Sequence, residues 1–164
     1  MITSSSNAKI KLVRSLKGRS RHRKAENAFV AEGVRLVEEA TDAGWPVEFI
    51  LFDETLSDRG LGLVNTLRKD EKLDVSQVTP DLMADISDTE TPQGILAVLK
   101  RQQLHLPDLP TFILIADQIR DPGNMGTLLR TAEAAGAEGV ILAPGTVDVF
   151  SPKVVRAGMG AHFR

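Results

Sequence analysis

The residue types with the most chemical potential lie in the segment DPGNMGTLLRTAEAAGA, residues 121–137. The apolar run TFILIAD before it is typical of a buried parallel strand, and the residues after the glycine-bearing loop are typical of a helix. If Asn124 caps that helix, its 3.6-residue period places Gly126, Arg130 and Glu133 on one face, away from the sheet. Arg130 would then stand on the helix, one turn above the cap and beside the loop at the strand's C-terminal end, a common place for ligands in α/β sheets, and Gly126 leaves room for a close approach. The structural alternative is a capped surface helix with an exposed Arg–Glu pair.

A second segment with cations and small residues is FSPKVVRAGMGAHFR, residues 150–164. Its serine–proline pair can begin a helix whose first turns carry Lys153 and Arg156. Gly158 and Gly160 then permit close backbone packing or the approach of a phosphate. Two cations beside small residues suit a phosphate-bearing substrate, whereas the structural alternative is a short helix ended by glycines.

Basic residues are concentrated at the N-terminus. Residues 1–25 hold eight Lys or Arg and no Asp or Glu, while the remainder holds twelve basic and twenty-two acidic residues, a balance of −10. This distribution predicts contact with a polyanion such as RNA, the alternative being a merely solvated face. With six Phe, one Trp and no Tyr, recognition through backbone and shape is favoured over base stacking. The predicted RNA contacts of this basic arm are Lys9, Lys11, Arg14, Lys17, Arg19, Arg21, Arg23 and Lys24.

Helical and strand periodicities alternate over the first hundred residues. Helices are expected at 7–17, 34–44, 61–69 and 80–87, and strands at 29–33, 47–53, 73–78 and 94–100. The segment GRSRHRKAEN at 18–27 is too polar to pack and is expected to be a loop. This order predicts a three-layer α/β domain.

The segment RQQLHLPDLP breaks the alternation with two prolines and mixed polarity. We therefore expect a first domain over 1–103, a linker over 104–110 and a second domain over 111–164. The second domain opens with strands at 111–117 and 138–143 that flank a helix, which makes one βαβ unit.

Composition excludes several kinds of site. The chain has no cysteine, so disulfides, thiolate metal sites and a cysteine nucleophile are ruled out. The three histidines are far apart in sequence and show no metal-ligand spacing, so no metal is expected. No apolar run approaches the ~20 residues of a membrane helix. We expect no membrane partner and a cytoplasmic location.

The two segments together resemble the SpoU (TrmH-like) family of RNA ribose 2′-O-methyltransferases, within the SPOUT superfamily. The resemblance rests on N-x-G-x-x-x-R, formed by Asn124, Gly126 and Arg130, and on S-P-K-V-V-R-A-x-x-G-A from Ser151 to Ala161. The first hundred residues resemble the family's substrate-binding domain, a ribosomal-protein-like α/β/α fold that binds structured RNA. The matching strings there are FVAEGVRLVEEA and TETPQGILAV.

The resemblance implies S-adenosylmethionine as the methyl donor, rRNA or tRNA as the substrate and a homodimer. It also implies a C-terminal trefoil knot that forms the cofactor pocket. The family's third motif, with an N-E-x-x-G loop, is not found in this sequence. We therefore expect an incomplete SPOUT domain, with cofactor-binding residues beyond Arg164. We expect a chain that binds RNA weakly and S-adenosylmethionine poorly, and that does not turn over alone.

The resemblance also implies roles for single residues. Arg130 is the catalytic residue, proposed in the family as a general base. Because guanidinium groups hold their proton strongly, an electrostatic role on a phosphate or a developing alkoxide is the alternative. Asn124 would shape the loop and orient Arg130 or the ribose, and Glu133 would hold Arg130 in place. Lys153 and Arg156 are candidate RNA-phosphate contacts.

Two other functions fit parts of the sequence. A non-catalytic RNA-binding module would need only the first domain. A nucleotide-binding α/β enzyme could use the DPGNMG loop for phosphate. The sequence lacks G-x-G-x-x-G and a P-loop lysine, which weighs against the nucleotide-binding enzyme.

Overall fold

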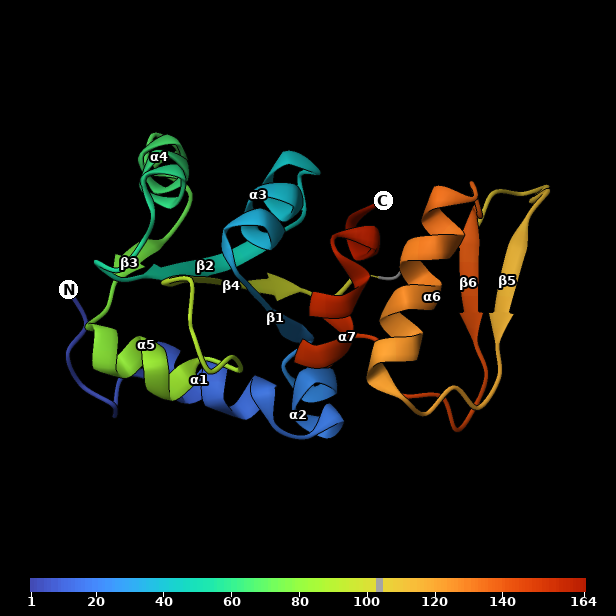
Figure 1. Cartoon of the computed structure of the whole chain (residues 1–164), viewed down its shortest axis with the longest axis horizontal. Helices are drawn as coiled ribbons and strands as arrows, with labels where there is room; N and C mark the ends of the chain where they lie inside the picture. The colour runs from blue at the N-terminus through green and yellow to red at the C-terminus, as the bar shows by residue number, and fades with distance from the viewer. Residues whose placement is uncertain (103–104) are drawn as a thin grey trace. The chain divides into compact units, whose positions relative to one another are not determined.

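The computed structural model of the chain describes residues 1–102 and 105–164 and divides into two units. Unit 1 comprises Met1–Arg101 and unit 2 comprises Gln102–Arg164 (Figure 1). Residues 103 and 104, where the predicted first domain ends and the predicted linker begins, lie outside the described residues.

A four-stranded mixed sheet forms the centre of unit 1. Strand β4 pairs antiparallel with β1 on one side and with β2 on the other, and β3 continues the sheet parallel to β2. Residues 95–99 of β4 are all buried, because this apolar strand lies inside the sheet and both faces are covered. The strands are β1 (Ala28–Glu32), β2 (Val47–Phe52), β3 (Val75–Gln77) and β4 (Ile95–Lys100).

Five helices cover the two faces of this sheet. Figure 1 shows α1, α2 and α5 on one face and α3 and α4 on the other. Successive side chains of β4 point to opposite faces of the sheet. Leu96 and Val98 therefore share one face, where they pack in one cluster with Ile10 of α1 and Ile86 of α5. The predicted α/β class is confirmed. The helices are α1 (Ala8–Lys17), α2 (Ser20–Ala25), α3 (Val34–Asp42), α4 (Asp58–Leu67) and α5 (Pro80–Ile86).

One prediction for unit 1 is wrong. The polar segment 18–27, expected to be a loop, contains helix α2. The segment packs because Arg23 is only 3% exposed and donates hydrogen bonds to backbone carbonyls at the end of α1. A buried arginine can be accommodated where its N–H groups find acceptors.

Unit 2 is built on two parallel strands joined by a helix. Ala116, Met125 and Val154 form the centre of its core. The elements are β5 (Ile113–Ala116), α6 (Pro122–Ala134), β6 (Gly139–Leu142), α7 (Pro152–Gly158) and the short 3₁₀ helix η1 (Ala161–Phe163).

The sheet of unit 2 is less buried than expected. The run 111–117 was predicted to be a strand buried on both faces, but Ile115 is 66% exposed and its register partner Ile141 is 44% exposed. Helix α6 covers only one face of the two strands in Figure 1. The opposite face, which carries Ile115 and Ile141, is therefore open in this chain.

Across residues 1–102 and 105–164, no helix combines the length and the apolar character needed to cross a membrane.

Candidate active site and basic surface

Helix α6 begins at Pro122, two residues before Asn124, which the sequence suggested as its cap. Asp121 is the N-cap, and its Oδ1 accepts a hydrogen bond from the Asn124 N–H at 2.7 Å. Pro122 fills the first helical position, where its lack of an N–H has no cost. The expectation that Asn124 caps the helix is wrong, because Asn124 lies inside the first turn and uses its backbone N–H, not its side chain. Asn124 is therefore an exposed residue in the first turn of α6, and its side chain makes no cap bond.

The loop between β5 and α6 is fixed by the segment that follows β6. The Val147 N–H donates to the Ile119 carbonyl at 2.8 Å, and Thr146 Oγ1 donates to the Ala116 carbonyl at 3.1 Å. Gln118 has a φ of 53°, a left-handed conformation that non-glycine residues adopt infrequently. Arg120, which sequence analysis did not single out, is exposed in this loop. The sequence could have pointed to Arg120 because it lies directly before Asp121, in the loop that follows β5.

Gly126 serves helix packing and does not face solvent. It is buried, and a Cβ atom added there would lie 2.3 Å from the Ala157 Cβ and 2.9 Å from the Gly158 backbone nitrogen. Helix α7 therefore approaches α6 at this glycine. The expectation that Gly126 leaves room for a ligand, on the same outward face as Arg130, is wrong.

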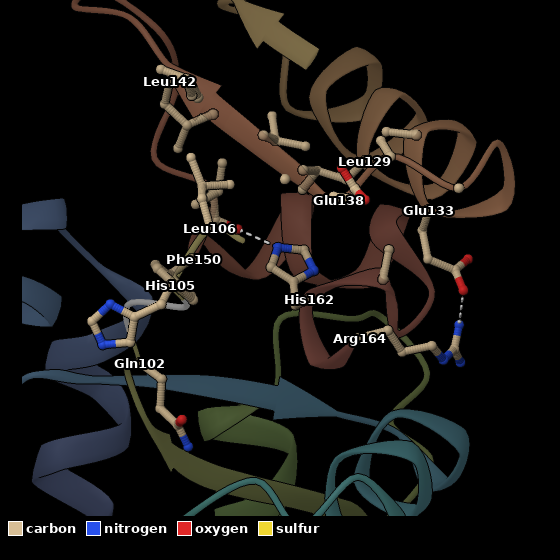
Figure 2. A pocket seen from close by; sticks show the side chains of 18 residues that line it. Gln102, His105, Leu106, Leu129, Glu133, Glu138, Leu142, Phe150, His162 and Arg164 are labelled. Atoms are coloured by element: carbon tan, nitrogen blue, oxygen red, sulfur yellow. Dashed lines mark hydrogen bonds and ion pairs between the residues drawn. The ribbon is translucent and has the colours of Figure 1, made fainter. Parts of the chain in front are cut away.

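Arg130 is exposed on α6. Among the described residues, its guanidinium makes no hydrogen bond or ion pair. Glu133, expected to hold Arg130, instead accepts a hydrogen bond from Arg164 Nη1 at 3.1 Å (Figure 2). Arg130 and Glu133 therefore do not form an i, i+3 pair, because Glu133 pairs with Arg164. The charge of Arg130 remains available to an anion.

Helix α7 carries the second predicted pair of cations. Lys153 is exposed, whereas Arg156 is half-buried and interacts within the protein. Gly158 packs closely, since a Cβ atom there would lie 2.7 Å from His162 Cε1, and Gly160 adopts a φ of 94°. Of the two roles that the sequence allowed for these glycines, the contacts made by Gly158 favour backbone packing.

A recess of about 860 Å³ opens beside β6 in unit 2 (Figure 2). His162 of η1 lines it together with Leu129 of α6 and Phe150. His162 Nε2 lies 2.8 Å from the Val149 carbonyl oxygen, so it carries the hydrogen and donates it, while the buried Nδ1 has no partner. Burial lowers the pKa of His162, and the bond to Val149 raises it by a smaller amount. In the sequence, His162 is one of three histidines that lie far apart. Nothing in the sequence predicted that its imidazole would be buried.

Four of the eight cations of the basic arm are engaged within unit 1, and two of them bind acidic side chains. Lys9 Nζ donates to Asp74 Oδ1 at 2.6 Å and to Ser76 Oγ at 2.8 Å. This hydrogen bond from Lys9 holds the pKa of Asp74 below its usual range, against a smaller opposing effect of burial. Arg14 Nε donates to Asp85 Oδ2 at 2.9 Å.

The other two engaged cations bind backbone carbonyls. Lys17 Nζ donates to the carbonyl of Ser87. Arg23 Nη1 donates to the carbonyls of Leu16 at 2.6 Å and Gly18 at 2.9 Å. Because Arg23 is buried, the expectation that it contacts RNA is wrong. The remaining four cations of the arm are exposed, namely Lys11, Arg19, Arg21 and Lys24.

No metal site emerges from the part of the chain that the structure describes. His, Asp and Glu side chains form no group of three there that could hold a metal ion.

Each of the two units matches a known protein family. Residues 7–97 match the family model of the MRM3-like substrate binding domain, and residues 111–164 match that of the SpoU rRNA Methylase family. The chain carries an MRM3-like substrate binding domain followed by a SpoU methylase segment. The SpoU match begins at residue 111, just before β5, and contains Asn124 and Arg130.

Curated SpoU relatives are longer than this chain. It is 38% identical over 152 residues to mitochondrial rRNA methyltransferase 3 of Mus musculus, covering 87% of this chain and 35% of the relative. It is 36% identical over 167 residues to the 23S rRNA (guanosine(2553)-2′-O)-methyltransferase RlmP of Bacillus subtilis (strain 168), covering 99% of this chain and 62% of the relative.

Two solved methyltransferase structures are similar in fold to this chain. An rRNA methyltransferase from Sinorhizobium meliloti matches with a TM-score of 0.83 at 32% identity, over 99% of this chain and 61% of that one. The SpoU methyltransferase AviRb from Streptomyces viridochromogenes, solved in complex with the cofactor AdoMet, matches with a TM-score of 0.81 at 31% identity, over 96% of this chain and 59% of that one.

Proposed function

We propose that this chain belongs to an RNA ribose 2′-O-methyltransferase that transfers a methyl group from S-adenosylmethionine to rRNA or tRNA. The observation that carries this proposal is the exposed Arg130 guanidinium, which has no partner among the described residues and stands on α6, within the SpoU match. Relatives of this SpoU chain are named rRNA methyltransferases, and one similar structure was solved with AdoMet.

In this proposal the two units have different roles, one in RNA binding and one in methyl transfer. Residues 1–103 bind structured RNA, 104–110 form the linker, and 111–164 contribute the N-terminal part of the methyltransferase domain. The match of unit 1 to a substrate binding domain supports the division. A homodimer and a cytoplasmic location complete the proposal, and sedimentation of the purified protein tests the dimer.

S-adenosylmethionine supplies an already activated methyl group on its sulfonium. The residues of unit 2 do not by themselves make a site for it. The recess beside β6 presents one unpartnered buried acceptor, His162 Nδ1, and the carboxylate of Glu133 at its rim is paired with Arg164.

Two side chains of α6 can act on the RNA. Guanidinium groups stay protonated in proteins, so an exposed arginine is a fixed positive charge and not a ready proton acceptor. We propose that Arg130 binds a phosphate beside the target ribose and stabilises the alkoxide that develops as the 2′-hydroxyl gives up its proton to solvent water. Asn124, exposed in the first turn of α6, would orient the ribose.

The test is to map ribose methylation in cells with and without the gene that encodes this chain. We expect one site or a small set of sites to lose 2′-O-methylation in the deletion and to regain it with the wild-type gene. Arg130→Ala should reduce the methylation rate by about 10²–10³, the scale of losing one transition-state donor. Arg59→Ala, which removes an exposed arginine of α4, should restore methylation fully.

A non-catalytic RNA-binding module is the second candidate, favoured by the exposed cations of the basic arm, namely Lys11, Arg19, Arg21 and Lys24. Full complementation by Arg130→Ala, with the protein at normal abundance, would support that module and overturn the methyltransferase.

A further inference from the structure

The basic arm divides into cations that hold unit 1 together and cations that face solvent. Lys9, Arg14, Lys17 and Arg23 all have partners within the unit. Their partners hold these four side chains to unit 1, so they are less available to RNA phosphates than the solvent-facing cations.

The solvent-facing cations are concentrated on α2. Arg19 precedes the helix and Arg21 and Lys24 lie on it, so three cations fall within six residues. Arg21 and Lys24 are three residues apart, which makes them neighbours on the helix surface at ~5–6 Å between Cβ atoms. Arg21 Nε lies 3.4 Å from His22 Nε2, a long contact that leaves the rest of its guanidinium to solvent. Glu26, at the end of α2, is the first acidic residue of the chain.

Arg23 fixes the position of this short helix. Its guanidinium is buried and donates to the carbonyls of Leu16 and Gly18, which lie at the C-terminal end of α1. His22 Nδ1 lies 3.3 Å from the carbonyl of Ser15 in the same turn. A six-residue helix is too short to be stable alone, so these bonds hold α2 against α1. We name α1, α2 and the turn between them, residues 8–25, the α1–α2 elbow.

Unit 1 offers no aromatic platform to unpaired bases in its described part. All four of its aromatic residues are buried, at most 7% exposed: Phe29, Trp45, Phe49 and Phe52. Single-stranded nucleic acid is held largely by stacking on exposed aromatic rings, whereas double-helical RNA is recognised by shape and by contacts with phosphates and 2′-hydroxyls.

Building on the proposed RNA methyltransferase, we propose that the α1–α2 elbow binds the phosphate backbone of double-helical RNA. Arg19, Arg21 and Lys24 contact phosphates, and Lys11 of α1 extends the same charge. Arg23 is a positioning residue that presents these cations without touching the RNA. This surface selects helical over single-stranded RNA and is indifferent to base sequence.

The first test measures binding of the full chain to a labelled RNA duplex of about 16 base pairs and to a uridine single strand of equal length, over a series of salt concentrations. The triple variant Arg19→Gln/Arg21→Gln/Lys24→Gln should weaken duplex binding and reduce the slope of log K against log salt by about three, one for each phosphate contact. The matched control is Arg59→Gln/Lys69→Gln/Lys72→Gln, which removes three exposed cations on and after α4. It should leave the slope unchanged.

Two results would overturn the elbow proposal. One is equal loss of binding in the two triple variants, which would mean that only net charge matters. The other is single-strand binding as tight as duplex binding. Either result, together with lost methylation in Arg130→Ala, would leave the methyltransferase proposal standing.

The second test isolates Arg23. Arg23→Gln should weaken duplex binding in the wild-type background and have no further effect in the Arg19/Arg21/Lys24 triple variant, because its effect passes through those side chains. A merely structural role would lower the free energy of unfolding equally in both backgrounds. An undiminished effect of Arg23→Gln on duplex binding in the triple variant would overturn the positioning role.

Discussion

His162 is buried with one ring nitrogen bonded and the other unsatisfied. Nε2 donates to the Val149 carbonyl, so the neutral ring is the form that this site accepts. Protonation of Nδ1 would place a second N–H and a positive charge where no acceptor lies within the described residues. Burial accordingly lowers the pKa of His162 from its ordinary value of about 6.5.

A lowered histidine pKa makes unit 2 less stable in acid. Below about pH 6.5 the unfolded chain binds a proton at His162 that the folded chain refuses, so the free energy of unfolding falls as the pH falls. We expect this residue to contribute a slope of up to about 1.4 kcal/mol per pH unit, which ends once the pH passes below the folded pKa. Urea unfolding between pH 8 and pH 5 measures it.

His162→Gln keeps a donor for Val149 but does not titrate in this range. At pH 8 the difference between wild type and variant reports packing alone, and only the further change toward pH 5 reports the proton. If the two proteins lose stability in parallel over that range, His162 is not the source of the acid sensitivity.

At the scale of the element, the start of α6 depends on one side chain. Asp121 satisfies the N–H of Asn124, one of the backbone N–H groups that the first turn leaves without helical partners. Its negative charge also lies at the positive end of the helix dipole. The same turn presents Asn124, so the cap and the candidate site share their geometry.

Asp121→Ala should destabilise the first turn of α6 by about 1 kcal/mol, the usual cost of losing an N-cap. The Asn124 side chain makes no cap bond, so Asn124→Ala should change stability by less than about 0.5 kcal/mol. Amide hydrogen exchange over the first turn of α6 distinguishes the two variants, and Asp121→Ser, which retains a cap acceptor, serves as the control. Greater loss of protection in Asn124→Ala would restore Asn124 as the cap.

At the scale of the whole molecule, the two units differ in how completely they cover their sheets. Helices lie on both faces of the sheet in unit 1, while one face of the two strands in unit 2 stays open. Exposed apolar side chains on one face promote association and bind apolar dyes.

Ile115→Lys should lower dye fluorescence and concentration-dependent light scattering of the purified chain. Because Ile115 is 66% exposed, the free energy of unfolding should change by less than about 0.5 kcal/mol. Leu61→Lys, at an exposed apolar position of α4, is the matched control and should change neither signal. Unchanged dye binding in Ile115→Lys would show that the open face of β5 and β6 is not the source.

The sequence by itself determined the α/β class and the location of the candidate site. Apolar periodicity is set by which residues must leave water, so the strands and most helices of unit 1 were readable from spacing alone. The segment with Asn124 and Arg130 was identifiable because a glycine-bearing loop between a strand and a helix N-terminus is a common place for ligands in α/β sheets. The excess of positive charge before residue 26 was also plain without a structure.

Only the tertiary structure decided which side chains were free to act. Arg19 and Arg23 look alike in the sequence, yet one is exposed and the other bonds to carbonyls at the end of α1. Gly126 was expected beside a ligand, but it faces Ala157, thirty-one residues further along the chain. Periodicity locates a residue on a helix face, whereas the partner of that face comes from chain distant in sequence. That pairing determines whether a charged side chain is bonded within the fold or exposed to solvent.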